Sequence, residues 1–89
     1  MPTVTLLTNE TFVIRLGPGA QSTMLPKSAT LVSGEPDNVK LKIKGTVAID
    51  SFCFKIDTEN EVPHRINQNL VRAILREDGS SVWQNPDPA

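Results

Sequence analysis

Three lysines on one face of a predicted strand are the residues whose spacing best suits a chemical role. Residues 38–45 read Asn-Val-Lys-Leu-Lys-Ile-Lys-Gly, so that Lys40, Lys42 and Lys44 alternate with apolar side chains. Successive side chains of a strand point to opposite faces, which puts the three ammonium groups about 6.5–7 Å apart on one face. That spacing suits the phosphates or sulfates of a polyanion. The same pattern is typical of a solvated outer face or of lysines that discourage edge pairing.

The composition favours the second interpretation of the lysines. The chain carries nine basic and ten acidic residues, for a net charge of −1, and no aromatic residue is interleaved with the lysines for base stacking. Proteins that bind phosphate backbones usually have a basic excess. Nucleic acid is therefore not expected as a partner, and the Lys40/Lys42/Lys44 face is kept as a candidate site for another polyanion.

Asp57, Glu59 and Glu61 alternate in a polar loop and offer the carboxylate oxygens that calcium prefers. The loop lacks the central glycine and the final acid of a helix-loop-helix calcium site. A hydrated loop explains these residues more simply than a metal site does. We predict no metal and no other cofactor.

Cys53 and His64, the single cysteine and the single histidine, are the pair that a thiol-imidazole dyad would need. Cys53 lies between Phe52 and Phe54, and strand alternation puts its thiol on the face opposite their rings. Neither residue has an accompanying signature, and no serine lies in a Gly-x-Ser-x-Gly elbow. We therefore predict no catalytic residues and a non-enzymatic protein.

Trp83 is the residue best suited to a protein interface, because tryptophan is enriched at interface hot spots. It follows Val82 near the end of the chain. The alternative is that Trp83 caps the core.

Short β-prone runs separated by turn formers account for most of the chain. Residues 3–7 and 11–16 are predicted to form a hairpin around Thr8-Asn9-Glu10, and residues 28–33 a further strand. Beyond the lysines, the apolar positions change parity across Asp50-Ser51. A tight reversal at that pair would explain the change and would place both Phe52 and Phe54 in the core.

The segment 65–77 is ambiguous between a strand and one helix. Ile66, Leu70 and Ile74 fit a helical stripe. The carboxylates at its end oppose the helix dipole, and Asp78-Gly79 is a strong hairpin signal. The strand is the preferred interpretation.

The predicted fold is mainly β: one small domain of six or seven short strands, arranged as a sandwich, a small barrel or a short β-solenoid. The solenoid is included because Asn38, Ile43 and Gly45 are echoed by Asn69, Ile74 and Gly79. We assign the domain to residues 1–84 and a flexible tail to residues 85–89.

Size and composition point to association. With 89 residues and one cysteine, the chain has a small core and no intramolecular disulfide, so a homo-oligomer is expected. Another protein partner is also compatible with the sequence.

No signal peptide or apolar span of membrane length is present, which makes a soluble, cytoplasmic protein the default expectation. The sequence predicts a non-catalytic structural or interaction module that self-associates through strand edges or an apolar patch around Trp83. The alternative is a small β-barrel that binds a polyanion.

Overall fold

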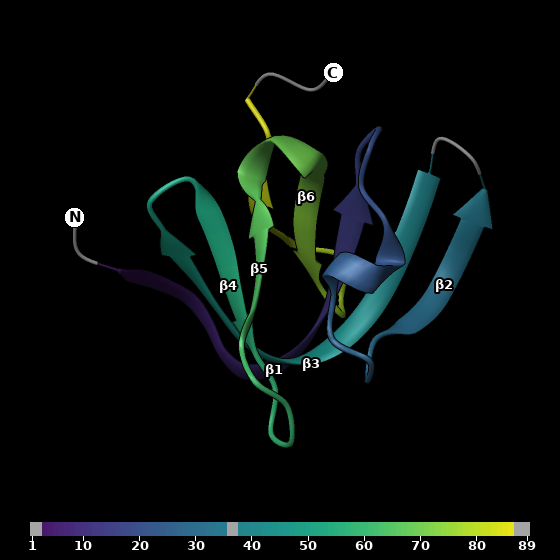
Figure 1. The fold of residues 1–89 in the computed structure, drawn as a ribbon. Helices are drawn as coiled ribbons and strands as arrows, with labels where there is room; N and C mark the ends of the chain where they lie inside the picture. The colour runs from purple at the N-terminus through teal and green to yellow at the C-terminus, as the bar shows by residue number, and fades with distance from the viewer. Residues whose placement is uncertain (1–2, 36–37, 87–89) are drawn as a thin grey trace.

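The described residues form a single, strongly curved antiparallel sheet of seven strands (Figure 1). A computed structural model describes residues 3–35 and 38–86. Its elements are β1 (Val4–Leu16), the 3-10 turn η1 (Ser22–Met24), β2 (Thr30–Glu35), β3 (Asn38–Asp50), β4 (Cys53–Asp57), β5 (His64–Asn67), the 3-10 turn η2 (Gln68–Leu70), β6 (Val71–Arg76) and β7 (Ser81–Gln84). The predicted mainly β class is confirmed.

Two long central strands organise the sheet. β1 and β3 have 13 residues each and pair with one another along most of their length. The strand order is β5-β4-β3-β1-β6-β7, and β2 also pairs with β3. On its second edge, β3 pairs with β2 near its start and with β4 near its end. β6 pairs only with residues 12–16 of β1.

The architecture differs from the three that the sequence suggested. The strands form one sheet rather than the two of a sandwich, and the sheet is not closed into a barrel. All strand pairs among the described residues are antiparallel, whereas the rungs of a solenoid stack in parallel. The sequence echo is not structural, because Gly45 lies within β3 whereas Gly79 lies in a turn with a φ of 93°.

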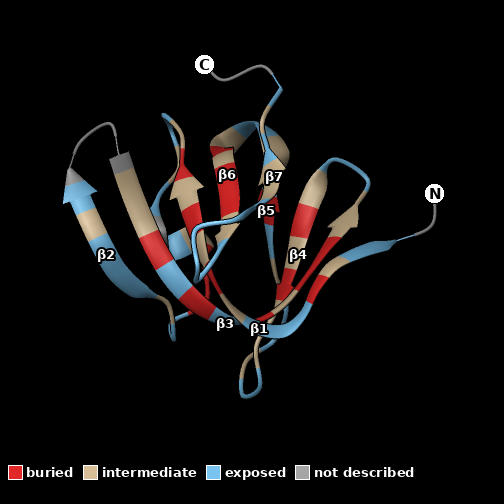
Figure 2. Cartoon of the chain, turned by 180° about the vertical axis from the view of Figure 1, so that it is seen from behind, coloured by how far each residue is buried: buried red, intermediate tan, exposed pale blue. Residues whose placement is uncertain are grey.

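The lysine-alternating stretch has the two faces that its pattern predicts. Leu41 and Ile43 are buried, Lys42 and Lys44 are exposed, and Lys40 is half-buried. The buried positions of the strands gather on the inner side of the curved sheet (Figure 2). This core contains Leu7, Phe12, Ile14, Leu16, Leu25, Leu41, Ile43, Val47, Phe54, Ile56, Ile66, Val71 and Ile74.

The hairpin predicted at residues 8–10 is wrong. β1 continues through these residues, because both of its halves pair with β3. Leu7 lies opposite Val47 and Glu10 lies opposite Gly45, which leaves two residues of β1 facing one of β3, the arrangement of a β-bulge. Asn9 takes a φ of 47°, a conformation that asparagine tolerates.

The reversal predicted at Asp50-Ser51 is confirmed, but the predicted position of Phe52 is wrong. Ser51 and Phe52 form the turn between β3 and β4, and Ser51 has a φ of 58°. Phe52 therefore lies outside the strand ladder and is 79% exposed. The buried phenylalanines are Phe54, as predicted, and Phe12.

The segment 65–77 is extended, so the helix alternative is wrong. β5 and β6 are separated by one 3-10 turn. The Asn69 N–H of this turn donates to the Asn67 side chain at 2.9 Å, and the Gln68 N–H donates to the Phe52 carbonyl at 2.9 Å. The predicted turn at Asp78-Gly79 then leads into β7. The Gly79 N–H donates to the Arg76 carbonyl at 2.9 Å.

The end of β7 is tied to β6. Of the predicted tail, Asn85 donates its backbone N–H to the Arg72 carbonyl at 2.9 Å and its side-chain amide to the Val71 carbonyl at 3.1 Å. Residues 87–89 lie outside the described residues.

Within residues 3–35 and 38–86, no helix has the length and apolar character needed to cross a membrane.

Candidate interaction site

One edge of β1 is open over the first part of the strand. β3 pairs with β1 from Val4 to Leu16, whereas β6 pairs only from Phe12 onward. Among the described residues, no strand pairs with the second edge of residues 4–11. An unpaired edge offers backbone donors and acceptors to another chain. Its two register irregularities, between Thr5 and Leu7 and between Leu7 and Glu10, limit regular pairing there.

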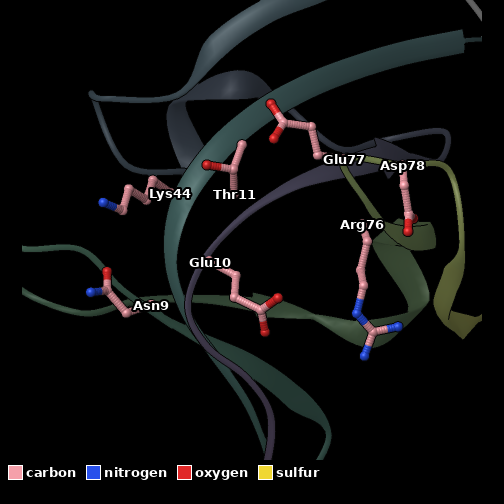
Figure 3. A pocket seen from close by; sticks show the side chains of 7 residues that line it. All are labelled: Asn9, Glu10, Thr11, Lys44, Arg76, Glu77 and Asp78. Atoms are coloured by element: carbon pink, nitrogen blue, oxygen red, sulfur yellow. The ribbon is translucent and has the colours of Figure 1, made fainter.

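A hollow of about 560 Å³ lies where this open edge meets the β6–β7 turn (Figure 3). β6 ends at Arg76, which lies opposite Phe12, so β6 does not pair with the residues of β1 that precede Phe12. The side chains around the hollow are polar or charged: Asn9, Glu10 and Thr11 of β1, Lys44 of β3, Arg76 of β6, and Glu77 and Asp78 of the turn. The set contains two basic and three acidic residues, so no single charge sign dominates.

The lysine face is partly neutralised at this hollow. Lys42 Nζ lies 2.9 Å from Glu77 Oε2 in an exposed ion pair, the kind that contributes little to stability. Lys44 borders the same hollow as Glu77 and Asp78. The Ser80 backbone N–H donates to Asp78 and lowers the pKa of that carboxyl, which keeps it charged. Acidic groups beside two of the three lysines reduce the positive potential that polyanion binding needs, and such binding stays a prediction.

Apolar side chains are exposed at the end of the sheet where β1 begins. A row of cross-strand neighbours runs from Phe54 through Ile49 to Val4. Phe54 is fully buried, Ile49 is half-buried and Val4 is 52% exposed. The neighbouring turn adds the exposed Phe52. We call Val4, Ile49 and Phe52 the apolar end.

Trp83 covers the buried end of this row. Its ring meets Phe54 edge to face, with ring centroids 4.7 Å apart and an interplanar angle of 82°. The contact joins β7 to β4, which are distant in strand order, so sheet curvature brings them together. Trp83 and Val82 are both partly buried against the core. Their predicted role in an interface stays a prediction.

The acidic loop does not gather its carboxylates. Asp57 lies 3.9 Å from the Lys55 ammonium, and Glu61 accepts hydrogen bonds from the segment before β2. In the part of the chain that the structure describes, no three His, Cys, Asp or Glu side chains are placed to hold a metal ion.

Cys53 and His64 lie on opposite faces of the β4–β5 pair. Cys53 is opposite Asn67 and His64 is opposite Ile56, so the two are three positions apart in register. An odd separation puts their side chains on different faces. The structure does not bring them together as a dyad.

Sequence reasoning missed the most exposed feature of the site. Phe52 was expected in the core because its parity matches that of Phe54. The turn at Ser51 removes Phe52 from that alternation.

No protein-family model, no curated protein sequence and no solved structure matches this chain.

Proposed function

We propose that the protein is a non-catalytic interaction module that associates with a second copy of itself through the apolar end. The observation that carries this proposal is Phe52, an aromatic side chain 79% exposed at a hairpin turn. Val4, 52% exposed, belongs to the same end of the sheet. Exposed apolar patches on small domains are typical of interaction sites.

The physical basis of the association is burial of these side chains. Aromatic residues contribute large areas to interfaces, and covering them releases ordered water. The adjoining open edge of β1 supplies backbone hydrogen-bonding groups, although its bulges restrict a long ladder. A two-fold arrangement would place both apolar ends against each other, because a closed dimer uses the same patch on each copy.

Phe52→Ser is expected to weaken the dimer at least about 30-fold in Kd, equivalent to about 2 kcal/mol for a central hot-spot residue. The fold should be unaffected, because the side chain is 79% exposed. Sedimentation equilibrium of the variant and the wild type measures the change.

Val62→Ser is the matched control, since Val62 is 77% exposed but lies in the β4–β5 loop. It should leave the Kd unchanged. Leu31→Ser tests the other exposed apolar site, the edge strand β2, where Leu31 is 58% exposed. Dissociation by Leu31→Ser with no effect of Phe52→Ser would contradict the assignment to the apolar end.

A further inference from the structure

We infer that Glu61 is a clamp whose charged carboxylate holds the segment before β2 over the inner face of the sheet and releases it on acidification. The carboxylate joins parts of the chain more than 30 residues apart. Oε1 accepts the Lys27 backbone N–H at 2.8 Å. Oε2 accepts the Ser28 backbone N–H at 3.2 Å and the Thr58 hydroxyl at 3.3 Å.

The held segment packs on the core through Leu25, but it has few other long-range hydrogen bonds. Residues 20–29 include one 3-10 turn, and the remaining backbone hydrogen bonds described there are local, such as Met24 N–H to the Gln21 carbonyl. Among the described residues, all hydrogen bonds that join this segment to a distant part of the chain end on Glu61. Leu25 and Pro26, just before the clamped amides, are buried.

Release of the clamp would uncover apolar surface. A groove of about 390 Å³ runs between this segment and the sheet, and its walls include Leu25, Pro26 and Ala29. Leu41 of β3, His64 of β5, Thr23 and Lys27 also line it, and the buried His64 Nδ1 has no hydrogen-bond partner among the described residues. Movement of the segment would therefore widen this groove and expose more of its apolar lining, beside the unpartnered His64 Nδ1.

The charged groups around the clamp are few. Lys27 is on the clamped segment, Lys44 and Glu59 share a second hollow with Glu61, and His64 faces the groove. Asp57 ends β4 and lies near Lys55. None of these groups forms an ion pair with Glu61 within the described residues, so the backbone amides are its main partners.

The direction of the pH effect follows from the hydrogen bonds. The Lys27 N–H is the largest cause that lowers the pKa of Glu61; burial opposes it, and the contacts of Ser28 and Thr58 lower the pKa further. A group with a lowered pKa in the folded state stabilises the fold above its ordinary pKa, and the stabilisation is lost as the pH falls through the lowered value. The clamp is therefore closed at neutral pH and opens in acid.

Amide hydrogen exchange at Lys27 and Ser28 tests the clamp. Glu61→Gln keeps the size and one acceptor but removes the charge, and it should speed exchange of these two amides at least about tenfold at neutral pH. Glu61→Ala should speed it further. Amides of β1 and β3 in the same samples report whether each variant remains folded.

Glu59→Gln is the matched control, because Glu59 is exposed in the same loop. It should leave the exchange rates unchanged. In the wild type, protection of the two amides, corrected for intrinsic rates, should fall in acid before that of β1 and β3. Unchanged protection of Lys27 and Ser28 in folded Glu61→Gln, or loss of protection in acid only together with the whole sheet, would overturn the inference.

Discussion

Gly45→Ala is expected to destabilise the fold by about 2–3 kcal/mol and to lower the Tm by roughly 10–20 °C. Gly45 is buried where the second edge of β3 passes from pairing with β2 to pairing with β4. A Cβ at this position would overlap the Asp57 carbonyl oxygen and would also crowd the Thr58 methyl group. The obstacle is backbone, so a side-chain rotation cannot relieve it, and the β3–β4 pair would have to separate.

Gly17→Ala is the control for this prediction. A Cβ on Gly17 would meet its nearest neighbour, the Leu70 carbonyl oxygen, at 3.5 Å, which is ordinary van der Waals contact. It should change the free energy of unfolding by about 0.5 kcal/mol or less. Chemical denaturation of both variants measures the difference. Equal stability of the two would show that β3 and β4 do not approach as closely as described.

Trp83→Ala is expected to destabilise the fold by about 2–3 kcal/mol, because it removes the edge-to-face contact with Phe54 and uncovers that side of the core. Trp83→Phe keeps an aromatic ring over Phe54 and should cost about 1 kcal/mol or less. Thermal unfolding of the two variants measures the comparison.

A different result for Trp83→Ala would assign the side chain to the interface. A Trp83→Ala variant that unfolds at the wild-type temperature but no longer self-associates would place the tryptophan in the interface instead of the core. Measuring the Tm and the solution mass on the same samples separates the two roles.

Local patterns with strict alternation predicted their part of the fold well. The lysine face of β3 is correct because a shift by one residue would bury three charges, a cost that fixes the register. The turn at Asp78-Gly79 is correct because glycine readily takes the positive φ that the turn requires. In both places, short-range chemistry alone selects one conformation.

Features that depend on distant partners were not predictable in the same way. Thr8-Asn9-Glu10 has the composition of a turn, but it becomes a bulge because β3 is long enough to pair with both flanking segments. The hydrogen bonds of Glu61 could not be predicted for a similar reason. Its partners at Lys27 and Ser28 lie more than 30 residues away, and only the folded sheet brings them together.

The mass of the wild-type protein in solution tests self-association most directly. Sedimentation equilibrium from low micromolar to near-millimolar concentration should show a shift from the 9.7 kDa chain toward twice that mass. The shift should persist at high salt, because the proposed contact is apolar. A single 9.7 kDa species at every concentration would contradict the proposal.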